Sequence, residues 1–139
     1  MIRLIAILIG GVLGGCAAPS VPPAGSQFDG SYAGQNTLTR GWGYLCGATS
    51  YPASLTVSGG RFDYPFAVSV SPPRTVPVPI QIAADGTFAG QLQYVTKDYF
   101  PMPYDRTTWV TVTGRIAAGT LDATITDYRC TRRLMAKLG

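Results

Sequence analysis

The sequence predicts an all-β domain over residues 28–139, most specifically a small antiparallel up-and-down barrel of about eight strands. Thr, Val, Tyr, Gly and Pro are frequent, whereas Glu is absent and only two Lys are present, so residues favoured in long helices are scarce. Apolar and polar residues alternate along successive short segments, which indicates strands that bury one face. Turns that contain glycine separate these segments.

The first half of the domain contains three expected strands. They cover residues 30–39, 53–58 and 61–70, and a stretch rich in glycine and aromatic residues lies between the first two, over 40–52. Gly59-Gly60 suits a two-residue hairpin turn, because both positions can adopt positive φ. The apolar residues that share a face in the second and third strands are Leu55, Val57, Phe62, Tyr64 and Phe66.

The second half contains five more expected strands. They cover residues 75–83, 87–95, 108–116, 121–125 and 129–138, after a proline-containing break at 71–74. Turns are expected at 84–86 and 118–119, and a longer loop at 97–106. Pro77 and Pro79 cannot donate to a ladder, so their strand should lie at an edge or have an interrupted partner.

Closure into a barrel is favoured because eight strands with one apolar face each can remove all exposed edges. Consecutive hairpins also favour this order, whereas a β-sandwich built from the same strands is the alternative. Gly30-Ser31-Tyr32 is similar to the Gly-x-Trp start of lipocalin-type and avidin-type barrels, and this short resemblance implies the same architecture.

The N-terminus has the form of an export signal. Arg3 precedes an uncharged apolar run over residues 4–15, which is too short to span a bilayer and has the length of a signal-peptide core. Leu13-Gly14-Gly15-Cys16 resembles the lipobox of bacterial lipoproteins, although that family prefers Ala, Ser or Thr where this chain has Gly14. The resemblance implies removal of residues 1–15 and a diacylglyceryl group on Cys16. The alternative is an ordinary signal peptide or short anchor in which Cys16 is incidental.

Residues 16–27 are expected to form the lipidated cysteine and a flexible tether rich in Pro, Ser, Gly and Ala. Two or three acyl chains would anchor the protein to a membrane permanently. Ala17 stands where enterobacterial lipoproteins retained at the inner membrane carry Asp, so the periplasmic face of the outer membrane is the expected location. No cofactor is expected beyond the covalent lipid.

Cys46 and Cys130 remain for a disulfide, as expected in an exported protein. A redox pair or a metal site is the alternative. No metal site is predicted, because the chain lacks both His and a Cys-x-x-Cys motif.

Three groups of residues are candidates for binding. The loop at 97–106 carries large side chains suited to anchoring a partner, namely Tyr99, Phe100, Met102 and Tyr104. The glycine-rich segment before Cys46 carries Trp42 and Tyr44. The last strand is basic and carries Arg129, Arg132 and Arg133. The alternatives are a loop that plugs the barrel, aromatic rings that cover the disulfide, and a solvated charged face. Arg132 shares a face with apolar residues, so it should either reach the barrel mouth or pair with an interior Asp.

Catalysis is not expected, since the chain has no His or Glu and no free Cys once the lipid and the disulfide are assigned. Asp98 and Asp105 flank the loop, but seven scattered Asp residues produce such pairs by chance. A nucleic-acid partner is not expected at a net charge of only +4. The leading hypothesis is a non-enzymatic envelope lipoprotein that acts as a binding or accessory module for an envelope protein. The alternatives are a protease or lysozyme inhibitor and a carrier of a small apolar ligand, which would need a hollow barrel.

Overall fold

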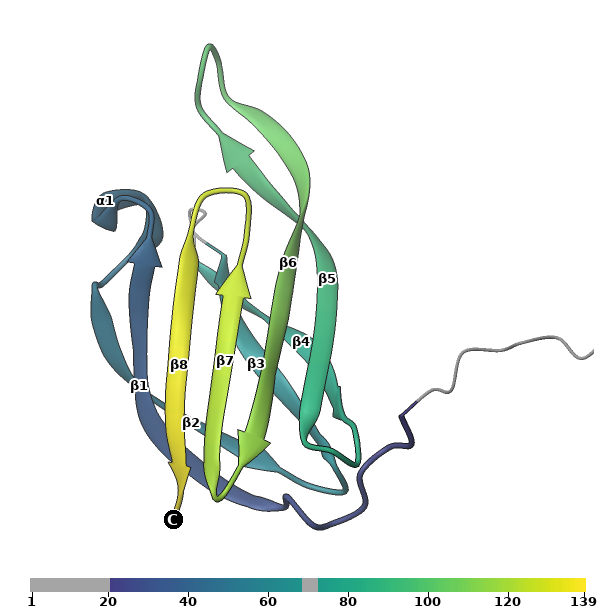
Figure 1. Ribbon diagram of the computed structural model, residues 1–139. Coiled ribbons are helices and arrows are strands. Elements are labelled where there is room, and N and C mark those ends of the chain that lie inside the picture. The colour runs from purple at the N-terminus through teal and green to yellow at the C-terminus, as the bar shows by residue number, and fades with distance from the viewer. Residues whose placement is uncertain (1–20, 69–72) are drawn as a thin grey trace, which may run out of the picture.

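The computed structural model describes residues 21–68 and 73–139. The signal segment 1–15, Cys16 and the tether up to residue 20 lie outside this part of the chain. Eight strands form one antiparallel sheet in the order β2-β1-β8-β7-β6-β5-β4-β3, so the all-β up-and-down prediction is confirmed (Figure 1). The elements are β1 (Gly30–Arg40), α1 (Gly43–Cys46), β2 (Ser50–Val57), β3 (Arg61–Val68), β4 (Arg74–Ile82), β5 (Thr87–Asp98), β6 (Tyr104–Ala117), β7 (Thr120–Thr126) and β8 (Thr131–Leu138).

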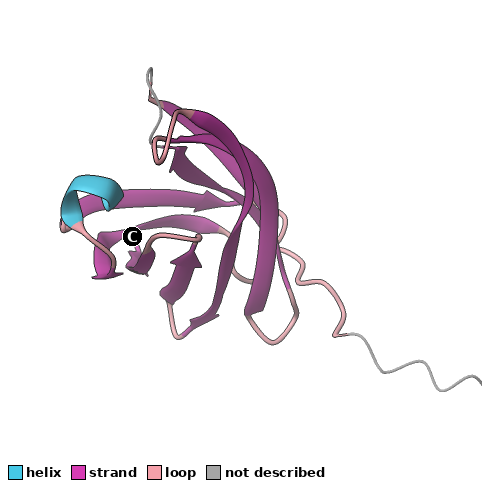
Figure 2. Ribbon diagram, turned by 90° about the horizontal axis from the view of Figure 1, so that it is seen from above, coloured by secondary structure: helices cyan, strands magenta, loops and turns pink. Residues whose placement is uncertain are grey.

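The sheet curls into a nearly closed barrel, which Figure 2 shows from above. Apolar and polar residues alternate along the strands, so the apolar residues face inward and the others are exposed on the outside of the curled sheet. Closure depends on β1, which pairs with β2 on one side and with β8 on the other. The apolar side chains with no more than 2% exposure that fill the interior are Tyr32, Val57, Val68, Val78, Ile80, Ile82, Val110, Val112, Ile116, Leu121, Ala123, Leu134 and Ala136.

A seam remains between β2 and β3. Their Gly59-Gly60 turn has the expected positive φ values of 61° and 71°, but beyond it the two strands form only the bridge between Ser58 and Arg61. The sequence prediction of a hairpin there is therefore right for the turn and wrong for the ladder. Pro52 pairs with β1 and Pro65 pairs with β4. The backbone nitrogen of each proline, which has no hydrogen to donate, therefore faces the seam.

The interruption predicted from Pro77 and Pro79 is confirmed. Along β4, only Gln81 and Ile82 pair with β5, whereas eight consecutive residues pair with β3. Both prolines stand in the β3 ladder, so their missing donors face β5 and the two strands diverge beyond Gln81. The gap is spanned inside the barrel by Phe66 and Tyr94, whose rings meet edge-on at 5.0 Å.

The segment 97–106 differs from its prediction as a loop. The β5–β6 ladder continues without a break to the pair Asp98–Tyr104, so only residues 99–103 form a turn. Opposite charges stand directly across this extension, with Lys97 Nζ 3.2 Å from Asp105 Oδ1. The result is a long hairpin that projects beyond the other strands (Figure 1).

The opposite end of the barrel is covered by the segment before β1. Ala84 N–H donates to Pro22 O, and Ala24 N–H donates to Ile82 O at 2.9 Å, with Ala24 itself buried. Asp29 accepts hydrogen bonds from Gly59 and Gly60 N–H at 2.8 and 3.1 Å. Within the described residues, contacts with the barrel are made from Pro22 onward, inside the stretch expected to be a free tether. No helix in the described ranges is long and apolar enough to cross a membrane.

Phe88→Ala tests the core at this closed end. Phe88 lies across from Gly114 in the β5–β6 ladder and meets Phe62 edge-on at 5.3 Å. We expect the free energy of unfolding to fall by about 3–5 kcal/mol, because the substitution leaves a cavity. Chemical denaturation measures it, with Val95→Ala on the exposed side of the same strand as a control that changes it by less than about 1 kcal/mol. Equal effects of the two substitutions would contradict this assignment of the core.

Candidate functional site

The barrel has a distinct open end, here called the mouth. It is formed by α1, the Cys46–Cys130 disulfide, the turn between β7 and β8, and the hairpin of β5 and β6 (Figure 1). The predicted disulfide is confirmed and joins α1 to the residue just before β8, with a Cα–Cα distance of 5.8 Å. Two groups of candidate residues therefore lie at the same end of the barrel.

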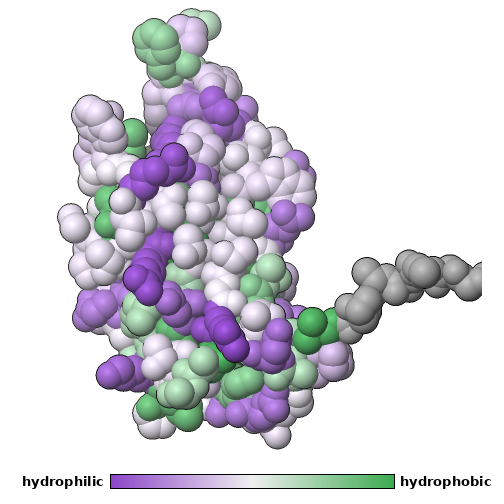
Figure 3. All heavy atoms as spheres, viewed as in Figure 1, coloured by the Kyte–Doolittle hydropathy of each residue, from purple (hydrophilic) through white to green (hydrophobic). Residues whose placement is uncertain are grey.

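The hairpin tip, residues 99–103, is exposed. Phe100 and Met102 keep 86% and 72% of their surface in contact with solvent, and Tyr99 keeps more than half. The alternative in which this segment folds over the barrel and plugs it is therefore wrong. Figure 3 shows hydrophobic atoms at the end of the projecting hairpin, above a more polar surface.

Asp98 braces the base of the hairpin. Its carboxylate accepts hydrogen bonds from Arg106 Nε at 2.7 Å, Arg129 Nη2 at 2.6 Å and the Tyr104 hydroxyl at 3.2 Å. The hydrogen bond from Arg106 is the main reason that the pKa of Asp98 lies below its ordinary value. Since Asp105 pairs instead with Lys97, the two carboxylates serve as separate ion-pair partners across the hairpin.

Trp42 and Tyr44 lie at the other side of the mouth, on and just before α1. Their exposed fractions are 74% and 83%, which disagrees with the alternative that they cover the disulfide. The one-turn helix was not expected from the sequence. It is closed by hydrogen bonds from Leu45 and Cys46 N–H to Trp42 O, both at 2.9 Å.

Arg132 reaches the barrel mouth, which is one of its two expected arrangements, and it does not pair with an interior Asp of the described chain. The side chain is only 8% exposed, and its partners are neutral: Nε donates to Asn36 Oδ1 at 2.7 Å, Nη1 to Cys46 O at 2.9 Å, and Nη2 to Ala48 O at 2.6 Å. The Tyr51 ring covers the guanidinium at 4.8 Å. The end of α1 and the residue Ala48 after it supply carbonyl oxygens at the mouth, which explains why no carboxylate is needed to hold this cation.

The other basic residues of the last segment are dispersed. Arg129 turns to Asp98 and the Tyr128 ring, whereas Arg133 points outward and pairs with Asp122 at 2.7 Å. The predicted cluster of Arg129, Arg132 and Arg133 is therefore divided among the hairpin base, the interior and the outer face. It does not form one basic surface.

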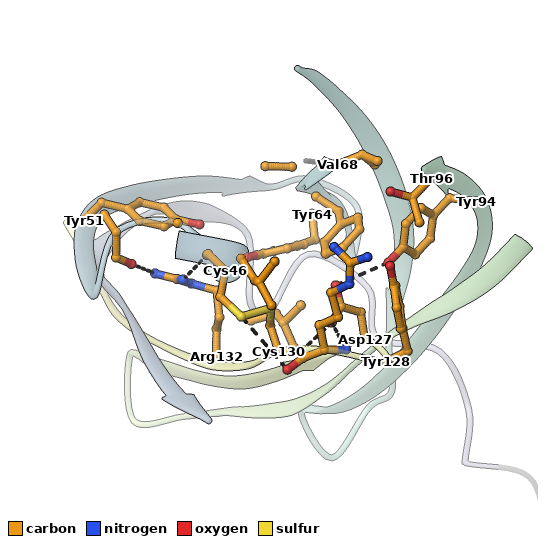
Figure 4. Close-up of a pocket in the computed structure, with 17 residues that line it drawn as sticks. Cys46, Tyr51, Tyr64, Val68, Tyr94, Thr96, Asp127, Tyr128, Cys130 and Arg132 are labelled. Atoms are coloured by element: carbon orange, nitrogen blue, oxygen red, sulfur yellow. Dashed lines mark hydrogen bonds between the residues drawn. A yellow bond between two sulfur atoms is a disulfide. The ribbon is translucent and has the colours of Figure 1, made fainter. Parts of the chain in front are cut away.

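A pocket of about 190 Å³ opens at the mouth (Figure 4). One wall carries Tyr51 and Arg132, and the opposite wall carries Tyr94, Asp127 and Tyr128. Asp127 accepts hydrogen bonds from the Tyr94 hydroxyl and from two backbone N–H groups of the β7–β8 turn.

Tyr64 lies between these walls, and its hydroxyl accepts a hydrogen bond from Asn36 Nδ2 at 2.7 Å. Burial is the main cause that raises the pKa of Tyr64, so its hydroxyl stays protonated at any ordinary pH. Asn36 belongs to this network but was missed in the sequence analysis. Strict alternation from Tyr32 would have placed it inside, since the two residues are four apart on β1.

Within the described residues, no cluster of three or more metal-ligating side chains occurs. Comparison of the chain with protein-family models, curated proteins and solved structures finds no match.

Arg106→Gln tests the bracing role of Asp98. Removing the main hydrogen bond to the carboxylate should raise the pKa of Asp98 toward its ordinary value. A lowered carboxyl pKa stabilises the folded state at pH values above the ordinary pKa, and this stabilisation is lost as the pH falls through the pKa of the folded state. With the pKa of Asp98 raised, the hairpin of the variant should therefore loosen at a higher pH during acidification. Carboxyl-carbon NMR titration measures the pKa, with Arg115→Gln on the outer face of β6 as the control. An unchanged pKa in Arg106→Gln would contradict the proposed bracing.

Proposed function

We propose that this protein is a lipid-anchored component of the cell envelope that binds a partner protein through its hairpin tip and performs no catalysis. The observation that carries the proposal is the exposed aromatic tip, residues 99–103, which follows a base braced by Asp98 and lies at the barrel end opposite to the N-terminal segment. Large side chains on a braced turn lose little conformational entropy on binding, and they are the residue types that dominate interface energies.

The lipid anchor rests on the lipobox at residues 13–16. The disulfide supports an oxidising compartment, which agrees with export but does not specify a membrane. The periplasmic face of the outer membrane remains the location that we propose, from Ala17. A chain of six residues from Cys16 to the first barrel contact at Pro22 can extend at most about 20 Å. The closed end of the barrel would therefore stay near the bilayer surface.

This arrangement favours a protein partner over the lipid surface. The N-terminal segment contacts Ala84, close to the start of β5, whereas the tip follows the end of the same strand at Asp98. A strand from Thr87 to Asp98 spans on the order of 35 Å. A barrel anchored at its closed end thus presents the tip away from the membrane that holds it.

The inhibitor alternative is kept because a projecting hairpin suits insertion into the cleft of a protease or a lysozyme. The carrier of an apolar ligand has less support. The interior is filled by side chains such as Val78, Val110 and Leu134, which have no exposed surface. The mouth pocket, at about 190 Å³, is smaller than the roughly 300 Å³ of sites for drug-sized ligands, and its lining includes Asp127 and Arg132, which do not suit an apolar molecule.

The double substitution Phe100→Ser and Met102→Ser tests the tip without touching Asp98 or its partners. A photo-crosslinking residue at Tyr99 should give a defined adduct with an envelope protein in intact cells, and the double substitution should reduce its yield at least about tenfold. The same crosslinker at Thr113, on the outer face of β6, is the matched control and should give no such adduct. An adduct of unchanged yield in the double variant would contradict binding through the tip.

Cys16→Ser tests the anchor separately. We expect the substitution to block lipidation, so that the protein is released from the membrane fraction or accumulates with its signal segment attached. Fractionation and mass spectrometry of the purified chain measure both results. Cys46→Ser serves as the comparison, because it removes a thiol without changing the lipobox. Membrane association and mass that match the unsubstituted protein would rule out a lipid on Cys16.

A further inference from the structure

We infer that the mouth pocket is a binding site for a compact cyclic acid, a small ring that carries a carboxylate and, across the ring, a second polar oxygen. The carboxylate would lie against Arg132 and the second oxygen against Tyr128, on the opposite wall (Figure 4). This site is separate from the hairpin tip and requires no lipid anchor.

Arg132 supplies the positive charge. A guanidinium has five N–H groups, and three of those on Arg132 donate to Asn36, Cys46 and Ala48. The other two have no acceptor among residues 21–68 and 73–139, and no carboxylate of that part of the chain pairs with Arg132. A cation that is nine-tenths buried, lines a pocket and lacks a counter-ion is stabilised by an anion that enters.

Tyr128 supplies a donor on the opposite wall. Its hydroxyl oxygen is buried and has no hydrogen-bond partner in the described part of the chain. The Arg106 and Arg129 guanidinium groups lie against its ring at 4.8 and 4.7 Å, which holds the side chain in place. A buried hydroxyl without a protein partner is costly. The Tyr128 hydroxyl is covered in this structure, so a ligand oxygen reaches it only when the ring turns slightly toward the pocket, and the bond then formed offsets that cost.

Asp127 determines the direction in which the ligand lies. Its carboxylate occupies the same wall as Tyr128 and would repel a second carboxylate, whereas it can accept a hydrogen bond from a ligand hydroxyl. Arg129 also lines the pocket on the side of Tyr128, but it is already paired with Asp98, whereas Arg132 has no carboxylate partner in the described chain. A ligand carboxylate is therefore favoured on the side of Arg132. Tyr64 lies between the two walls, and each wall adds one tyrosine ring, Tyr51 beside Arg132 and Tyr94 beside Asp127. Such aromatic walls suit a flat or compact ring.

The size of the pocket limits the ligand to one ring. Its volume of about 190 Å³ corresponds to roughly six water molecules, which excludes a lipid chain or a disaccharide. Aromatic hydroxy acids and sugar acids share the required chemistry.

The test is a titration of the full chain, oxidised and held in detergent micelles, followed by proton–nitrogen NMR at the amides of Thr96 and Cys130. The probes are 4-hydroxybenzoate for an aromatic acid and glucuronate for a sugar acid. We expect at least one of them to shift these amides with saturation. The uncharged 4-hydroxybenzamide should bind at least about tenfold more weakly than 4-hydroxybenzoate, because it cannot pair with Arg132. Saturation by glucuronate alone would assign the site to a sugar acid, and failure of both acids would overturn the proposal.

Two substitutions identify the groups involved. Arg132→Gln should weaken binding of the acid at least about tenfold, and Tyr128→Phe about fivefold. Tyr128→Phe removes a hydroxyl that has no protein partner, so the variant should fold normally even if Arg132→Gln disturbs α1. Arg115→Gln makes the same change of charge on the outer face of β6 and should leave the affinity unchanged. Binding by a folded Tyr128→Phe variant that equals binding by the unsubstituted chain would overturn the assignment of Tyr128 and the orientation derived from it.

Discussion

The pairing of β1 with β8 is the interaction on which the other features of this structure depend. It joins the first strand of the domain to the last, turns a linear series of hairpins into a barrel, and brings Cys46 within reach of Cys130. It also places Asn36 near the start of β8, where Arg132 can donate to it. The disulfide closes a loop of 84 residues, which in the chain-entropy description destabilises the unfolded chain by about 4–5 kcal/mol. The covalent link and the hydrogen-bonded ladder therefore support the same closure.

Proline limits this closure and thereby shapes the mouth. Pro77 and Pro79 prevent β4 from completing its ladder with β5, and Pro52 and Pro65 leave donors missing along the seam between β2 and β3. Such edges are poor templates for pairing with another chain, which protects an incompletely closed sheet. At the mouth the divergence of β4 and β5 is filled by aromatic rings instead of backbone hydrogen bonds. A pocket lined by tyrosines is the consequence.

The two ends of the barrel have different character for this reason. The closed end is apolar, packed, and covered by the segment from Pro22 to Asp29. The mouth gathers buried polar groups, several ion pairs and the most exposed aromatic residues of the described chain. Polar groups at the mouth can be held because the disulfide and Arg132 fix α1, and because Asp98 joins the hairpin to the β7–β8 turn. Rigidity there is compatible with exposure, which is the combination that a binding surface needs.

The sequence by itself determined the strands, most turns, the disulfide and the effect of the β4 prolines, because alternation, glycine and proline act locally on the backbone. It also pointed to Tyr99, Phe100 and Met102, but it could not establish whether they fill the barrel or leave it, since that depends on how far the β5–β6 ladder continues. Only the tertiary structure decided the position of Arg132. Its acceptors, Asn36, Cys46 and Ala48, lie more than eighty residues away in the chain and become neighbours through closure alone. The same holds for the mouth pocket, because it brings Tyr51 of β2, Tyr64 of β3 and Tyr94 of β5 to the turn between β7 and β8, and no local pattern records those distances.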